Sequence, residues 1–190
     1  MVAVTVAERM TAAQFLGQPD RPGAEWLQLV EGEVVVTDPN ARHHFAQGDL
    51  VFAFETWSRS KGGRGRAMLP LDVALDDLNV FEPDIAWYAE GRVPTRDAVR
   101  PFAMPDLAVE IRSPSTWRYD IGAKKSAYER HGLPELWLVD TEADVVLVFR
   151  RSNPDALAFD VALELDRAQT LHSPLLPGFA LNLGELFPAR

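Results

Sequence analysis

The alternation of apolar and polar residues along the chain predicts both helices and strands. Residues 107–111 (Leu-Ala-Val-Glu-Ile) are apolar except for one glutamate, which is typical of a buried strand. A helix is expected from about residue 119 to residue 131, because Gly132 and Pro134 follow at the positions that usually end a helix. Residues 136–139 form another apolar run. The pattern around the glutamate therefore predicts a strand, a helix and a second strand.

The N-terminal part of the chain predicts a short helix, a hairpin and a longer helix. Residues 11–14 have the form of a capping box, which satisfies free amides at the start of a helix expected to end near Gly17. In residues 26–36, apolar residues flank a Glu-Gly-Glu turn, so we expect a β-hairpin with Glu31 at its tight turn. Residues 42–60 place aromatic side chains among polar ones, which indicates an amphipathic helix.

The remaining pattern completes a mixed α/β fold. Further expected elements are extended segments at 66–69, 71–75 and 85–88, a strand at 145–149 that pairs with the strand before it, a strand at 159–165, a proline-rich turn at 173–177 and a closing segment at 179–186. Such an order predicts a central mixed β-sheet flanked by helices, with additional hairpins. The chain length is that of one domain, and we expect residues 1–190 to form a single domain.

Composition excludes several classes of protein. The chain has no cysteine, so it has no disulfide framework, no thiolate zinc site and no cysteine nucleophile. The apolar run at residues 2–6 is too short for the core of a signal peptide, and the charged residues Glu8 and Arg9 follow it. No later apolar run reaches the length of a membrane-spanning helix. We therefore expect a cytoplasmic protein that does not enter a membrane.

The net charge restricts how this protein can bind nucleic acid. Nineteen lysines and arginines stand against 28 aspartates and glutamates, for a formal charge of −9. A chain of this charge repels polyanions at long range and lacks the broad basic face of an avid DNA-binding protein. Any role with nucleic acid must therefore depend on a local site.

Two carboxylates stand out because of where they occur. Asp84 directly precedes the apolar segment 85–88, and Glu110 lies inside the apolar strand 107–111. An ionised carboxylate in a core is costly unless it is paired or bound to a metal ion. Because side chains alternate along a strand, Arg112 shares a face with Glu110, so an ion pair between these two is the structural alternative to a metal site.

The helix after the glutamate-containing strand supplies a cation. Asp120, Lys124 and Tyr128 are four residues apart and share one helix face, in an order that also stabilises a helix. If this face turns toward the strand, Lys124 brings an ammonium group to the carboxylates. Two carboxylates and a lysine are what metal-assisted cleavage of a phosphodiester needs, because hard oxygens bind Mg²⁺ or Mn²⁺ and a cation offsets developing charge.

Two other groups of residues carry weaker signals. The glycine-rich segment 59–66, which contains Arg59, Lys61, Arg64 and Arg66, could contact phosphates, although a flexible solvated loop is the favoured interpretation. The adjacent His43 and His44 suggest a metal site, but neighbouring histidines on a helix point in different directions. We expect His44 to be structural or peripheral to the site.

Five segments, taken in order, resemble the Uma-type restriction endonuclease family, a branch of the PD-(D/E)xK nuclease superfamily. They are Val30-Glu31-Gly32-Glu33, Pro83-Asp84, residues 109–116 (Val-Glu-Ile-Arg-Ser-Pro-Ser-Thr), the face formed by Asp120, Lys124 and Tyr128, and residues 133–140 (Leu-Pro-Glu-Leu-Trp-Leu-Val-Asp). The resemblance implies a restriction-endonuclease-like fold and an Mg²⁺- or Mn²⁺-dependent endonuclease that hydrolyses DNA. By analogy with this class of nucleases, it also implies a homodimer.

The resemblance also implies roles for particular residues. Asp84 and Glu110 match the metal-binding acids, Lys124 the catalytic lysine, and Glu31 a further acid near the site. The wider superfamily has its lysine two residues after the second acid, where this chain has Arg112. Arginine stays protonated and cannot act as a base, so the lysine role is carried to Lys124 on the helix.

Two other functions stay open at this stage. One is a nuclease-like domain that has lost cleavage and serves as a protein-interaction or nucleic-acid-binding module, which the acidic net charge favours. The presence of Asp84, Glu110 and Lys124 counts against it, because a decayed site would be free to lose them. The other is a metal-assisted hydrolase of a smaller phosphoester, which an acidic surface would tolerate better than long DNA.

Overall fold

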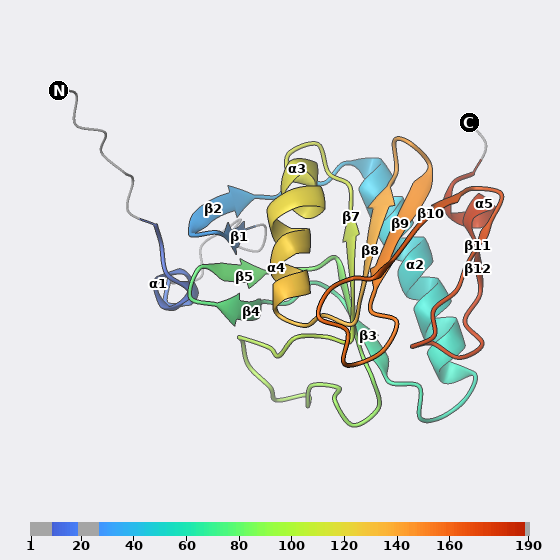
Figure 1. Ribbon diagram of the computed structural model, residues 1–190, viewed down its shortest axis with the longest axis horizontal. Helices are drawn as coiled ribbons and strands as arrows, with labels where there is room; N and C mark the ends of the chain where they lie inside the picture. Colours follow the sequence, from blue (N-terminus) through green and yellow to red (C-terminus); the bar gives the residue numbers. More distant parts are fainter. Residues whose placement is uncertain (1–8, 19–26, 189–190) are drawn as a thin grey trace.

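A six-stranded mixed β-sheet forms the centre of the computed structural model, which describes residues 9–18 and 27–188 (Figure 1). In spatial order its strands are β10 (Val161–Asp166), β9 (Val145–Arg150), β8 (Glu135–Asp140), β7 (Leu107–Ile111), β6 (Ile85–Tyr88) and β3 (Arg66–Met68). Strands β7 and β8 run parallel, and every other neighbouring pair is antiparallel. The predicted mixed sheet is confirmed.

A smaller antiparallel sheet lies beside the first, and a two-stranded ribbon lies in the C-terminal part of the chain (Figure 1). In spatial order the four strands of the smaller sheet are β2 (Glu33–Val36), β1 (Leu27–Val30), β5 (Asn79–Phe81) and β4 (Val73–Asp76), and the ribbon consists of β11 (Thr170–Leu171) and β12 (Leu181–Asn182). Strand β5 was not predicted, because three consecutive buried residues show no alternation in the sequence. The predicted hairpin is confirmed from Leu27 onward, while Trp26 lies outside the described residues.

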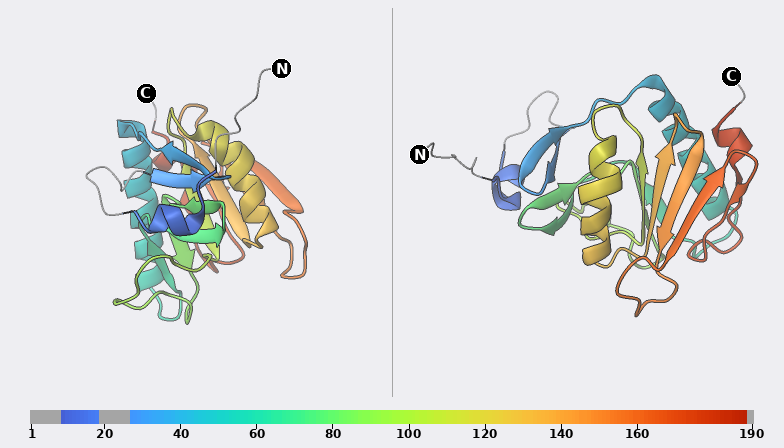
Figure 2. Two further views of the ribbon diagram at one scale, coloured as in Figure 1. Left: turned by 90° about the vertical axis from the view of Figure 1, so that its left-hand side faces the viewer. Right: turned by 45° about the horizontal axis from the view of Figure 1, so that its top comes forward.

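Helices cover both faces of the central sheet, with α2 on one side and α4 on the other (Figures 1 and 2). The helices are α1 (Ala12–Leu16), α2 (Ala41–Arg59), α3 (Trp117–Tyr119), the π-helical turn η2 (Asp120–Lys124), α4 (Lys125–Arg130) and α5 (Leu183–Leu186). The capping box at Thr11 and Gln14 and the helix predicted at residues 42–60 are confirmed. Within the described ranges, no helix combines the length and the apolar character needed to cross a membrane.

The two faces of β7 belong to different parts of the core. Leu107, Val109 and Ile111 pack in the cluster that contains the buried side of α2. Ala108 packs in the other cluster, with Tyr128 of α4. Because side chains alternate along a strand, Glu110 lies on the same face as Ala108. The fold therefore turns Glu110 toward the α4 side of the sheet.

Gly65 is a position where the turn after α2 requires glycine. Its φ is +64°, and a Cβ added there would lie 2.0 Å from the carbonyl oxygen of Tyr88. We expect Gly65→Ala to lower the free energy of unfolding by about 2–4 kcal/mol, because left-handed strain and backbone overlap add together. Urea unfolding measures this loss. Gly62→Ala is the matched control, since an added Cβ there meets nothing within 4 Å, and equal losses in the two variants would contradict the prediction.

Candidate active site

A buried ion pair joins the central strand to the helix that covers it. The ammonium Nζ of Lys124 lies 2.6 Å from Oε2 of Glu110. The hydroxyl of Tyr128 donates a hydrogen bond of 2.8 Å to Oε1 of the same carboxylate. All three side chains are buried. The helix face therefore brings Lys124 to the strand, as predicted. Both carboxylate oxygens of Glu110 have a partner.

Asp120 is a second buried carboxylate beside the same lysine. Its Oδ1 lies 3.0 Å from Nζ of Lys124, and its Oδ2 accepts a hydrogen bond of 3.2 Å from the hydroxyl of Thr116. The hydroxyls of Ser113 and Thr116 in turn share a hydrogen bond of 2.7 Å. Lys124 thus lies between two carboxylates, and the Asp120 carboxylate helps to hold its ammonium group in place.

The residues from Asp120 to Lys124 form one turn of π-helix between α3 and α4. The sequence predicted an uninterrupted α-helix here. A π-turn contains more residues per turn than an α-helix, and such single turns occur frequently at functional sites. Both ends of the turn carry buried charged side chains, Asp120 and Lys124. The ion pair and the irregular turn therefore coincide.

Asp84 lies next to this cluster and is held from two elements. Its Oδ2 accepts a hydrogen bond of 2.6 Å from the backbone N–H of Ile111, the residue after Glu110. Its Oδ1 lies 2.9 Å from Nε2 of His43, and its backbone carbonyl accepts a bond of 2.9 Å from the side chain of Gln47. The first turns of α2 and the end of β7 therefore position the Asp84 carboxylate together.

His43 is a site residue that the sequence reasoning missed. Its ring is 3% exposed and contacts Asp84, while the neighbouring His44 is exposed. His43 lies on the buried stripe of α2, one turn before Ala46 and two turns before Leu50. That spacing is visible in the sequence, and it would have placed His43 rather than His44 toward the sheet.

The electrostatics of the cluster follow from its burial. Burial raises the pKa of Glu110 to about 8, although the neighbouring Lys124 ammonium acts in the opposite direction. Burial also raises the pKa of Asp120. For Lys124, burial alone would lower the pKa, but the carboxylates of Asp120 and Glu110 raise it well above its ordinary value. The lysine therefore stays protonated at neutral pH, and the two acids hold their protons more tightly than free carboxyl groups do.

Glu82 adds another acid that the sequence reasoning did not single out. Burial, followed by the charge of Asp72, raises the pKa of Glu82 to about 8, and the charges of Lys124 and Asp84 also act on it. Glu82 is two residues before Asp84, so the end of β5 and the start of β6 bring it to the cluster. The site thus concentrates acidic groups around one lysine.

The raised pKa values predict how stability depends on pH in EDTA. Glu82 and Glu110 have pKa values of about 8, against an ordinary value of 4.5, so the folded chain binds these protons more tightly than the unfolded chain. Their contribution is complete below their ordinary pKa and is lost as the pH rises through the folded value. We therefore expect the free energy of unfolding to fall between about pH 5 and about pH 8.

Urea unfolding at several pH values checks this expectation. Glu82→Gln is expected to flatten the dependence, because glutamine keeps the shape of the side chain but has no proton to release. A free energy of unfolding that rises with pH over this range would contradict the assignment.

Glu31 and Arg112 are not joined to the cluster by any direct contact among the described residues. Glu31 lies exposed at the hairpin turn with φ +51°, and its backbone N–H donates a bond of 3.0 Å to Oδ1 of Asn79. Arg112 pairs with Asp140 at 2.8 Å and with Glu142 at 2.9 Å. The alternative of an ion pair between Arg112 and Glu110 is therefore wrong, and the role of Glu31 stays a prediction.

The basic segment after α2 is tied into the fold. Arg64 donates 2.7 Å hydrogen bonds to the carbonyl of Trp57 and to the hydroxyl of Ser60, and its guanidinium lies 4.8 Å from the centre of the Trp57 ring. Arg59 pairs with Glu55 at 2.7 Å. Arg64 therefore caps the C-terminus of α2. The interpretation of this segment as a flexible solvated loop did not predict these contacts.

The donor set of the cluster fits a hard divalent cation held by few protein ligands. Among the described residues, no group of three or more histidine, aspartate or glutamate side chains is arranged to hold a metal ion. Asp84 and Glu110 nevertheless offer carboxylate oxygens whose present hydrogen bonds use only part of their acceptor capacity. Mg²⁺ commonly binds through one or two carboxylates and keeps waters or phosphate oxygens as its other ligands.

A mixed sheet covered by α2 and α4, with two carboxylates and a lysine meeting at β6 and β7, defines a restriction-endonuclease-like α/β protein. A family model named Uma2, described as "Putative restriction endonuclease", matches residues 12–184. The chain belongs to this family, as the resemblance of its five segments predicted. Membership supports a nuclease.

A solved structure from Anabaena variabilis ATCC 29413, described as "a putative nuclease belonging to DUF820", shares the fold. It is 22% identical to this chain, the match covers 94% of this chain and 97% of the other, and the TM-score is 0.77. At this identity the likeness establishes the architecture. A comparison with curated proteins finds no match.

Proposed function

We propose that this protein is an Mg²⁺- or Mn²⁺-dependent endonuclease that hydrolyses phosphodiester bonds of DNA. The observation that carries the proposal is the meeting of Asp84, Glu110 and Lys124 at the end of β7, where the Lys124 ammonium lies 2.6 Å from the Glu110 carboxylate. Membership of the Uma2 family supports the same class of reaction.

The residues of the cluster divide into those that would touch the reacting groups and those that position them. Asp84 and Glu110 would hold the cation, which when bound polarises a phosphoryl oxygen and lowers the pKa of a bound water. Lys124, which stays protonated, offsets negative charge that develops on the phosphate.

Three further side chains orient the acids and the lysine. Tyr128 donates to Glu110, His43 contacts Asp84, and Asp120 lies against Lys124. Each contact involves a buried side chain, so each restricts the rotamers of the group it holds. These three residues are positioning residues in the proposed reaction.

His43→Gln is expected to weaken Mn²⁺ binding and to slow cleavage by about 10–100-fold, because loss of a residue that orients a ligand typically has this effect. Calorimetric titration with Mn²⁺ measures the binding without relying on activity. His44→Gln is the matched control, since the His44 side chain is exposed. Unchanged Mn²⁺ affinity in His43→Gln would show that the contact with Asp84 serves only the fold.

The proposed function includes a further acid, a dimeric assembly and a cellular location. Glu31 would extend the site when substrate is bound. A homodimer would supply one site for each strand of a duplex, and a cytoplasmic protein would meet DNA directly. Glu31 and the homodimer depend on the resemblance, the cytoplasmic location depends on the pattern of apolar runs in the sequence, and none of the three depends on a contact in the structure.

One observation favours a second candidate function. Lys124 and Glu110 are 1% and 2% exposed, so a phosphodiester reaches them only after neighbouring side chains move. The cluster is buried from solvent, and its lysine is paired with its own carboxylates. Such a cluster suits a domain that has kept the nuclease fold but acts as a protein-interaction or nucleic-acid-binding module. The net charge of −9 favours it as well.

Nicking of supercoiled plasmid separates the two functions. Wild-type protein is incubated at low salt with Mn²⁺, with Mg²⁺ or with EDTA, beside Glu110→Ala and Lys124→Ala. Glu164→Ala, which changes an exposed glutamate, and Lys125→Ala, which changes the lysine next to Lys124, are the matched controls. Nicking that requires metal, persists in the controls and disappears in both site variants establishes the nuclease. No nicking by folded wild-type protein, together with no Mn²⁺ binding, supports the interaction module.

Competition tests the size of the substrate. If short oligonucleotides inhibit nicking as strongly as an equal mass of plasmid, this result would indicate a preference for small phosphoesters. Weak inhibition by short oligonucleotides would support long DNA as the substrate.

A further inference from the structure

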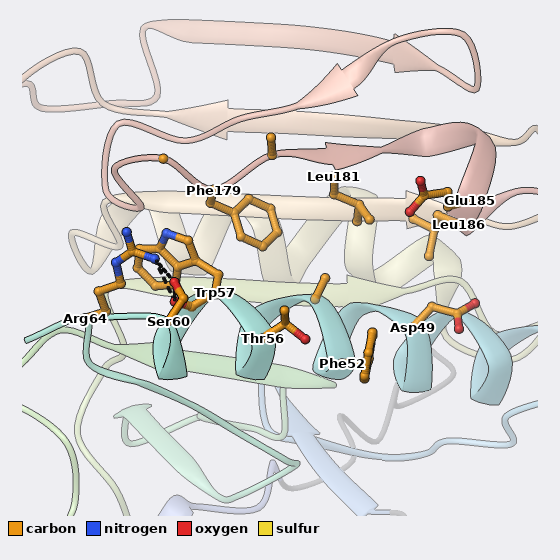
Figure 3. A pocket seen from close by; sticks show the side chains of 13 residues that line it. Asp49, Phe52, Thr56, Trp57, Ser60, Arg64, Phe179, Leu181, Glu185 and Leu186 are labelled. Carbon is orange, nitrogen blue, oxygen red and sulfur yellow. Dashed lines mark hydrogen bonds between the residues drawn. The ribbon is translucent and has the colours of Figure 1, made fainter. Parts of the chain in front are cut away.

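A groove runs along α2 on the flank formed by the helix and the C-terminal segment. One depression of about 480 Å³ and another of about 340 Å³ share Asp49 and Leu186 as lining residues. The first is walled by α2 on one side and by residues 178–186 on the other (Figure 3). Trp57, Phe179 and Leu181 contribute apolar side chains to its lining. None of the residues of the candidate active site lines either depression.

Two phenylalanines on the outer face of α2 lie unusually exposed beside this groove. Phe45 and Phe52 are each 75% exposed, are seven residues apart and therefore share one helix face. Gly48 lies between them, and a Cβ added to Gly48 would meet nothing within 4 Å. Glycine destabilises a helix interior, and no contact within the described residues requires it here. A partner backbone that approaches α2 closely would explain both the glycine and the exposed rings.

The charged side chains of the first depression differ between its two ends. Asp49 on α2 and Glu185 on α5 lie at the same end (Figure 3), and neither forms an ion pair with another described residue. At the opposite end, Arg64 is engaged with Trp57 and Ser60. The groove therefore offers apolar surface along its length and, near the point where its two depressions meet, the carboxylates of Asp49 and Glu185, which form no ion pair within the described chain.

A second copy of the chain fits this face poorly. A two-fold axis that packs Phe45 of one α2 against Phe52 of the other passes beside Gly48 and Asp49. Because Asp49 is next to Gly48, that axis would bring the two Asp49 carboxylates close together. Like charges placed opposite each other in an interface oppose association.

We propose that this groove binds an amphipathic helical segment of another protein, with apolar side chains that cover Phe45 and Phe52 and a lysine or arginine that reaches Asp49 and Glu185. This is helix-in-groove recognition, in which apolar anchors spaced along one helix face supply affinity and flanking charges supply direction. An endonuclease-like domain with a net charge of −9 gains from such a partner, because a basic protein would bring it to nucleic acid.

Selection from a phage-displayed library of random peptides tests this proposal on the full chain. Peptides of about 15 residues are used, because they span about 22 Å as a helix, most of the length of α2. Selected peptides are then titrated against wild type, Phe52→Ser, Asp49→Lys and Leu157→Ser. Leu157 is 94% exposed and lines neither depression, so it is the matched control. Thermal melts in EDTA establish that each variant is folded.

The expected result is a family of peptides with apolar residues at helical spacing and at least one lysine or arginine. Phe52→Ser and Asp49→Lys should each weaken their binding by about tenfold or more, and Leu157→Ser should leave it unchanged. Peptides without basic residues, or equal binding by all the folded variants, would overturn the proposal. A wild-type dimer in sedimentation that Phe52→Ser dissociates would also overturn it, because a second copy would then cover the face. None of these measurements depends on cleavage or on metal.

Discussion

Lys124→Met is expected to lower the free energy of unfolding by about 3–5 kcal/mol near pH 8, because it leaves the buried carboxylates of Glu110 and Asp120 without their cation. The loss should shrink as the pH falls. Both acids already have raised pKa values, and removal of the lysine raises them further, so each gains a proton more easily in the folded chain. Urea unfolding at about pH 5 and about pH 8 measures both effects.

Lys125→Met is the matched control for this experiment. Lys125 is the next residue, and its ammonium lies 4.5 Å from the centre of the Phe149 ring and 5.9 Å from that of Phe159, so the variant loses cation–π contacts and no ion pair. We expect a loss of about 0.5–1 kcal/mol with little dependence on pH. A Lys124→Met variant as stable as Lys125→Met near pH 8 would show that Glu110 and Asp120 do not depend on the lysine for their charge.

Asp84→Asn is expected to reduce metal-dependent cleavage by at least about 100-fold while the protein stays folded. Asparagine retains a side-chain oxygen that can accept the hydrogen bond from the Ile111 N–H, but it removes the negative charge that would hold the cation. Single-turnover nicking of plasmid measures the rate, and calorimetric titration with Mn²⁺ measures the binding. Both should fall together.

Asp97→Asn is the matched control for Asp84→Asn. Asp97→Asn changes an exposed loop aspartate and should leave rate and binding unchanged. If Asp84→Asn binds Mn²⁺ as tightly as wild type, Asp84 is not a ligand of the cation. If wild-type protein neither binds Mn²⁺ nor nicks plasmid, the module function replaces the nuclease.

The elements that carry the site were predictable because their signals are local. The strand at Leu107–Ile111, the helix after it and the strand at Glu135–Asp140 follow from apolar runs and from the glycine and proline that end the helix. The spacing of Asp120, Lys124 and Tyr128 predicted a shared face, and the structure turns that face toward Glu110. By contrast, β5 has three consecutive buried residues, a pattern too short for alternation to identify a strand.

The partners of each charged residue were not predictable in the same way. Arg112 and Glu110 have the spacing of a same-face pair along one strand, yet Arg112 pairs with Asp140 from β8 and with Glu142 beyond it. His43 contacts Asp84 across 41 positions of sequence, and Glu82 acquires its raised pKa mainly from burial. These relations depend on which elements pack against each other, and local spacing does not record that packing.

Apart from β5 and the π-turn, the sequence by itself determined the main elements, the mixed α/β class and the candidate carboxylates and lysine, because periodicity, turn residues and charges within apolar strands are local properties of the chain. Only the tertiary structure decided that Lys124 lies between Glu110 and Asp120, that a π-turn carries it, and that His43 holds Asp84. The physical reason is that ion pairs and burial are set by distances between segments far apart in the chain, and those distances exist only once the sheet and its two helical layers are packed.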